Sequence, residues 1–182
     1  MLKQKESYLG NPNVKRDGVL QQWTPDLLQE YKKCMHNPIY FVENYVKVIS
    51  LDDGMVPFVL YPYQRRMFEQ FQENRFSIVL ACRQSGKSIS ACAYLLWYVL
   101  FNPEKTVAIL ANKGATAREM LNRITLMLEN IPFFLQPGSD QKHSIKVVSN
   151  FLTTRVYLPL LLVGVPFVVC LLTFYILMSL LS

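Results

Sequence analysis

The segment that most constrains the fold of this chain is an eight-residue stretch at positions 81–88, Ala-Cys-Arg-Gln-Ser-Gly-Lys-Ser. A short apolar run with β-branched residues occupies 76–81, and a long apolar run follows over 87–101. The first run predicts a buried strand, and the second predicts a helix that the Asn-Pro pair at 102–103 stops. A strand that turns directly into a helix is typical of α/β folds.

The same order of strand and helix repeats further along the chain. Residues 106–111 predict a second apolar strand, and a capping box between Thr116 and Glu119 marks the start of another helix. Caps and prolines predict earlier helix starts near Thr24, Asn37 and Pro62. We therefore expect an α/β fold with a parallel sheet flanked by helices and preceded by an N-terminal helical segment.

The 81–88 segment also matches the usual phosphate-binding loop, G-x-x-x-x-G-K-[ST] between a strand and a helix, except that Ala81 replaces the first glycine. Gly86 lets the backbone turn so that consecutive N–H groups face one anion, and the helix that begins there adds the positive end of its dipole. The alternative is an ordinary helix start with a solvated lysine. The flanking strand and long apolar helix favour a partial P-loop NTPase instead.

The side chains of this loop suit a nucleoside triphosphate. Lys87 supplies a mobile charge for the β- and γ-phosphates, and the Ser88 hydroxyl can bind the Mg²⁺ that bridges them. The Arg83 guanidinium can reach the γ-phosphate and stabilise charge in the transition state, although a loop arginine paired with a surface carboxylate is an equally good interpretation. The expected phosphate-binding residues are Gln84, Ser85, Gly86, Lys87 and Ser88, with Arg83 and Lys87 as catalytic residues and Ser88 as the metal ligand.

A second signal precedes the strand, where Tyr63 and Gln64 follow a Tyr-Pro pair. A glutamine amide can donate to and accept from the N6/N7 edge of adenine, and a tyrosine offers a stacking face. On its own, this motif is better explained as a helix start with buried aromatic rings.

Three segments together resemble the ATPase domain of large terminase subunits from T4-like tailed bacteriophages. They are Leu-Tyr-Pro-Tyr-Gln at 60–64, the loop at 81–88, and Ile-Leu-Ala-Asn-Lys at 109–113. The resemblance covers roughly residues 1–137. It implies that ATP and Mg²⁺ are the cofactors, that Tyr63 and Gln64 hold adenine, and that Arg83 acts in cis on the γ-phosphate.

The resemblance further implies a viral DNA-packaging motor that hydrolyses ATP to move double-stranded DNA into the prohead. Its partners would be DNA, the portal protein and the small terminase subunit, in the host cytoplasm at the prohead portal. The formal net charge of +6 suits a phosphate-rich partner, and it suits a solvated basic surface equally well. Hydrophobic residues make up 51% of the chain, which is too many for a disordered protein.

The chain also departs from the family pattern, in which an apolar strand ending in Asp-Glu holds Mg²⁺ and activates water. The carboxylates after Lys87 are Glu104, Glu119, Glu129 and Asp140, and none of them ends an apolar strand run. The nuclease domain of the family has no counterpart either. We therefore expect ATP binding with very slow turnover, and whether the chain is an enzyme stays open.

The last part of the sequence has a different character. Every charged side chain lies at or before Arg155, and about 20 apolar residues suffice to cross a bilayer. We therefore expect a C-terminal hydrophobic helix at 156–181. It is either a membrane span or accidental sequence from a frameshift or a rearranged gene, and the abrupt end of the family pattern favours the second. The expected division is an arm with helices at 1–57, a partial P-loop ATPase core at 58–137 and an unrelated tail at 138–182. The alternatives are a membrane-tethered P-loop nucleotide-binding protein and a non-functional remnant of the motor.

Overall fold

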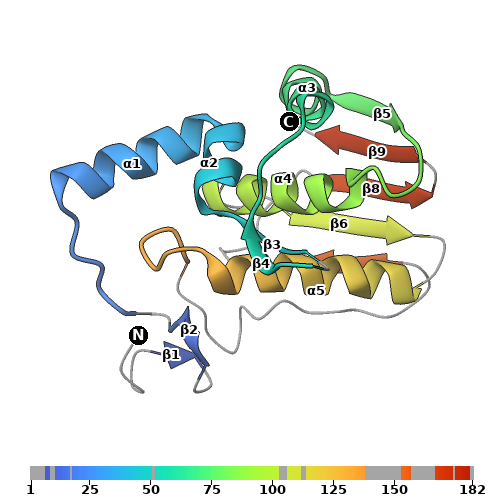
Figure 1. The fold of residues 1–182 in the computed structure, drawn as a ribbon. Coiled ribbons are helices and arrows are strands. Elements are labelled where there is room, and N and C mark those ends of the chain that lie inside the picture. Colours follow the sequence, from blue (N-terminus) through green and yellow to red (C-terminus); the bar gives the residue numbers. More distant parts are fainter. Residues whose placement is uncertain are drawn as a thin grey trace.

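The computed structural model describes residues 7–8, 11–16, 18–50, 52–102, 106–111, 114–137, 153–156, 167–173 and 175–180. Within these residues the chain forms a mixed α/β fold. A five-stranded sheet carries two long helices, α4 and α5, across one face, and a pair of shorter helices, α1 and α2, extends to one side (Figure 1).

The N-terminal helices begin where their caps predict. In α1 (Pro25–His36), the hydroxyl of Thr24 accepts a hydrogen bond from a first-turn backbone N–H at 3.3 Å. In α2 (Pro38–Tyr45), the side-chain oxygen of Asn37 does the same at 3.0 Å. Each cap satisfies a backbone donor that the helix itself leaves unpaired, so these short helices have defined ends.

Two small antiparallel sheets precede and follow these helices along the chain. They consist of β1 (Ser7–Tyr8) with β2 (Asn11–Lys15), and β3 (Lys47–Ser50) with β4 (Gly54–Pro57). The buried Gln136 side chain fixes β2 to the body of the protein. It accepts a hydrogen bond from the backbone N–H of Lys15 at 3.1 Å and donates one to the carbonyl of Asn13 at 2.9 Å.

The main sheet has the strand order β5-β9-β8-β6-β7. Its strands are β5 (Phe76–Leu80), β6 (Thr106–Ala111), β7 (Thr153–Val156), β8 (Phe167–Thr173) and β9 (Tyr175–Leu180). Only β6 and β8 pair in parallel among the described strands, so the prediction of a parallel sheet is wrong. The two strands predicted at 76–81 and 106–111 are present and run in the same direction. They are not neighbours, because the antiparallel β8–β9 pair lies between them.

The helix predicted at 156–181 is wrong over the part that the structure describes. Residues 167–173 and 175–180 are strands, and the positions at 157–166, 174 and 181 lie outside the described residues. The uncharged run is rich in β-branched and aromatic residues, which fit a strand as well as they fit a membrane helix. Among the described residues, no helix has both the length and the apolar character that crossing a membrane requires.

The core surrounds α4 (Lys87–Phe101), which packs against the sheet and against α2, α3 (Pro62–Glu73) and α5 (Gly114–Asn130). The ring of Tyr94 on α4 meets Phe68 and Phe71 of α3 edge-on, with centroid distances of 5.3 and 5.1 Å. Each such ring contributes about 1.5–3 kcal/mol when it is fully buried. This packing fixes the later turns of α3 against the middle of α4.

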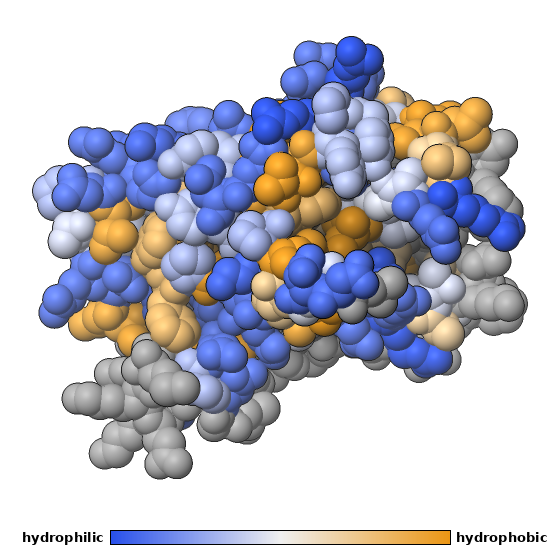
Figure 2. Space-filling model, viewed as in Figure 1, coloured by the Kyte–Doolittle hydropathy of each residue, from blue (hydrophilic) through white to orange (hydrophobic). Residues whose placement is uncertain are grey.

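The strand predicted as buried at 76–81 is buried on one side only. Phe76, Ile78 and Leu80 of β5 are 60%, 69% and 78% exposed, whereas Ser77 is buried. Figure 2 shows apolar surface gathered over the end of the molecule that carries β5. Periodicity suggested an apolar run, but it could not reveal which face of the strand a helix would cover.

Candidate functional site

The loop between β5 and α4 has the bent backbone that its sequence predicts. Gln84 has a φ of 60° and Gly86 a φ of 77°, both in the left-handed region. This conformation costs a residue with a side chain about 1–2 kcal/mol, which is avoided at Gly86 but not at Gln84. Left-handed residues interspersed with ordinary ones turn successive N–H groups toward one concavity, which is a common way to bind an anion.

Two side chains of the loop converge on one backbone carbonyl. The Lys87 ammonium and the Ser85 hydroxyl each donate to the carbonyl oxygen of Cys82 at 3.0 Å. An ammonium has three donors, and this bond uses one of them. The arrangement holds Lys87 over the loop instead of leaving it extended into solvent.

The first turn of α4 completes the loop. Both the backbone N–H and the hydroxyl of Ser90 donate to the Gly86 carbonyl at 3.0 Å, so the helix starts firmly at the glycine. Ser88 is the second residue of this helix and is half-buried. Arg83 lies exposed in the turn of the loop. The structure thus brings the predicted loop residues together at one helix start.

The structure also brings Tyr63 and Gln64 to this loop. The Tyr63 hydroxyl donates to the carbonyl oxygen of Ser85. The ring of Tyr63 stacks on that of Tyr61, with centroids 6.0 Å apart and planes inclined by 9°. Burial raises the pKa of Tyr63 above its ordinary value, so its hydroxyl remains a donor at neutral pH.

Gln64 is almost fully enclosed. Its side chain is 2% exposed, and its carboxamide oxygen accepts a hydrogen bond from the backbone N–H of Tyr61 at 2.9 Å. Its nitrogen faces the loop, since a β-carbon built on Gly86 would lie 2.8 Å from it. Gln64 therefore caps α3 and packs against the loop. The pattern of the sequence could not distinguish this structural role from adenine recognition.

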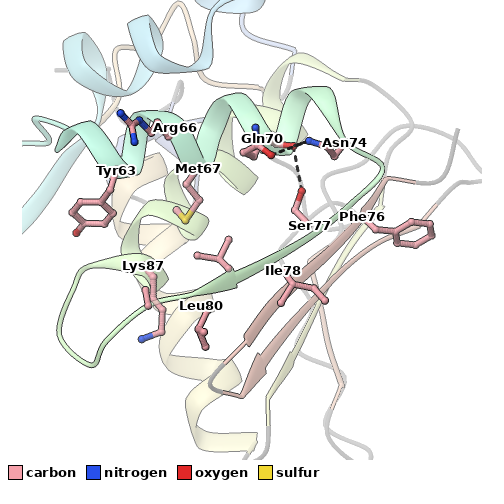
Figure 3. A pocket seen from close by; sticks show the side chains of 12 residues that line it. Tyr63, Arg66, Met67, Gln70, Asn74, Phe76, Ser77, Ile78, Leu80 and Lys87 are labelled. Atoms are coloured by element: carbon pink, nitrogen blue, oxygen red, sulfur yellow. Dashed lines mark hydrogen bonds between the residues drawn. The ribbon is translucent and has the colours of Figure 1, made fainter.

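A pocket of about 450 Å³ lies between α3 and β5, next to the loop (Figure 3). Lys87 and Arg66 contribute cations to its lining, and β5 contributes an apolar wall. At the other end, the side-chain amide of Asn74 donates to that of Gln70 at 3.1 Å. A cavity of this size, with a few polar groups on apolar walls, suits a small organic ligand.

Sequence reasoning missed Arg66 as a lining residue, although a signal for it existed. The residues that α3 contributes to the pocket are Tyr63, Arg66, Met67, Gln70 and Asn74, the last at the helix end. Their spacing of three or four residues places them on one helical face. Once Tyr63 is assigned to a site, this spacing identifies the residues that share its face.

The described carboxylates that follow Lys87 in the sequence lie on α5 and have other partners. Glu119 pairs with Arg123 at 2.5 Å, and Glu129 accepts a hydrogen bond from Asn11 at 3.2 Å. The predicted positions Glu104 and Asp140 lie outside the described residues. In the part of the chain that the structure describes, no cluster of three or more His, Cys, Asp or Glu residues could hold a metal ion.

A scan of the chain against models of known protein families finds no match.

Proposed function

We propose that this chain binds Mg·ATP through the loop at 81–88 and is the nucleotide-binding front part of a viral DNA-packaging ATPase of the large terminase type. The observation that carries the proposal is the backbone of the loop, in which Gln84 and Gly86 are left-handed and Lys87 is held over the turn. A left-handed glutamine has a strained backbone. Such residues persist only where the surrounding structure fixes them, and they are concentrated at active sites and ligand-binding sites.

Each loop residue has a role in this proposal. The backbone N–H groups from Gln84 onward hold the phosphates, and Lys87 reaches the β- and γ-phosphates. The Ser88 hydroxyl binds Mg²⁺, and Arg83 stabilises charge on the γ-phosphate. The base lies on the side of Tyr63, where α3 approaches the loop.

The motor part of the proposal rests on the terminase-like segments and on the net charge of +6. It implies double-stranded DNA, a portal protein and a small terminase subunit as partners, at the prohead portal in the host cytoplasm. Turnover by this chain should be slow, because a missing general base typically costs about 10²- to 10⁴-fold in rate. The described carboxylates after Lys87 are engaged on α5.

Isothermal titration of Mg·ATP into the wild-type chain and Lys87→Ala tests the nucleotide site. Removing a charge-assisted contact worth about 1.5–3 kcal/mol should weaken binding at least about tenfold. Lys32→Ala is the matched control, because it removes an exposed lysine of α1 that does not belong to the loop. Helix α1 contacts α4 near the end opposite the loop, where the Trp97 indole donates to the Cys34 carbonyl. Equal affinities for wild type and Lys87→Ala would refute the site. A folded chain that binds no ATP at all would favour the non-functional remnant.

A further inference from the structure

The bond from the Tyr63 hydroxyl to the Ser85 carbonyl acts on the peptide that joins Ser85 to Gly86. A peptide unit is planar and trans, so its N–H points away from its C=O. Holding the Ser85 carbonyl on the α3 side therefore directs the Gly86 N–H to the opposite side. The left-handed backbone at Gln84 and Gly86 forms the loop concavity around this same peptide.

Tyr63 is itself held firmly enough to orient the loop. Its helix is fixed to α4 by the edge contacts of Phe68 and Phe71 with Tyr94. Gln64 also approaches the loop closely, since a carbon added at Gly86 would lie 2.8 Å from its side-chain nitrogen. The Tyr63 hydroxyl thus links α3 to the peptide that lies between the two left-handed residues of the loop.

We propose that Tyr63 is a positioning residue of the phosphate site, whose hydroxyl fixes the Gly86 N–H to face the bound phosphate. The proposal rests on the proposed function, because it concerns the same loop. It differs from base stacking, which requires the ring of Tyr63 and not its hydroxyl. The two roles separate in Tyr63→Phe, which keeps the ring and removes the donor.

The experiment compares Mg·ATP with Mg·tripolyphosphate, a ligand that has no base. Tyr63→Phe should bind both ligands about fivefold more weakly than wild type, the fold-change that corresponds to about 1 kcal/mol for one net hydrogen bond. The matched control is Tyr40→Phe, which removes a hydroxyl bond to Glu30 in the N-terminal helices and should leave both affinities unchanged. Wild-type affinity of Tyr63→Phe for tripolyphosphate would overturn the proposal.

A spectroscopic measurement separates positioning from a general loss of stability. The amide resonance of Gly86 should move strongly downfield when tripolyphosphate saturates the wild type, and it should move less at saturation in Tyr63→Phe. An equal shift in both proteins would show that the hydroxyl does not orient this N–H. If the wild type binds neither ligand, the proposed function fails together with this inference. If the wild type binds both and Tyr63→Phe binds them equally, only the inference fails.

Discussion

The two faces of β5 have opposite surroundings. On one face, Ser77 is buried and its hydroxyl donates to the Gln70 carbonyl of α3 at 3.2 Å. On the other face, Phe76, Ile78 and Leu80 are more than half exposed. Of the two faces of this strand, only the one toward α3 is packed by a helix, while its edge pairs with β9. We therefore expect the geometry of the loop to depend on the packing of α3 and α4. It should depend much less on Phe76, Ile78 and Leu80, which form the open face of β5.

The largest expected effect comes from breaking the anchored side. Tyr94 is 1% exposed and contacts the rings of Phe68 and Phe71, so Tyr94→Ala should lower the free energy of unfolding by about 3–5 kcal/mol. Ile78→Ala, on the open face, should change it by less than about 0.5 kcal/mol. Urea unfolding of both variants measures the difference. Similar losses in the two variants would mean that the open face is covered in solution.

An intermediate effect is expected at Gly86. An alanine there meets both the left-handed backbone and the Gln64 nitrogen at 2.8 Å, whereas Gly54, with a φ of 72°, has open space around its added carbon. Gly54→Ala should therefore cost only the backbone strain of about 1–2 kcal/mol, and Gly86→Ala should cost more. Thermal unfolding measures both costs. Equal losses would indicate that α3 gives way easily and does not constrain the loop.

These contrasts explain which parts of the molecule the sequence could predict. The starts of α1 and α2 follow from Thr24 and Asn37 because a cap is a local hydrogen bond between residues close in sequence. The bend at Gly86 was predictable for the same reason, since the Gly-Lys-Ser pattern requires it. These features need no knowledge of distant neighbours.

The features that could not be predicted depend on contacts between distant segments. Whether the apolar run at 167–180 becomes a helix or two strands depends on the edges of β5 and β6 with which it pairs. The exposure of Ile78 depends on which face of the sheet the helices cover. Likewise, the closeness of the Gln64 side chain to Gly86 depends on how α3 packs beside the loop.

The smallest expected effect lies far from β5, among the N-terminal helices, and tests whether they are stabilised independently of the loop. Hydrogen bonds from Tyr40 and then Tyr45 hold the pKa of Glu30 below its ordinary value, because they favour the ionised carboxylate. A lowered folded-state pKa gives stability that is fully present above the unfolded pKa, near 4.5, and is lost as the pH falls through the folded value. Wild type should therefore lose more stability than Glu30→Gln as the pH is lowered from neutral to below the folded pKa of Glu30. Urea midpoints measured across this range test the expectation, and parallel curves for the two proteins would show that the carboxylate contributes nothing to folding.

The same pair of proteins tests whether this contact influences the loop. The hydroxyls of Tyr40 and Tyr45 belong to α2 and Glu30 belongs to α1, so the contact lies within the N-terminal helices. At any one pH, the folded wild type and folded Glu30→Gln should therefore bind tripolyphosphate with the same affinity. A difference in affinity would mean that the N-terminal helices also position the loop, through their packing on α4.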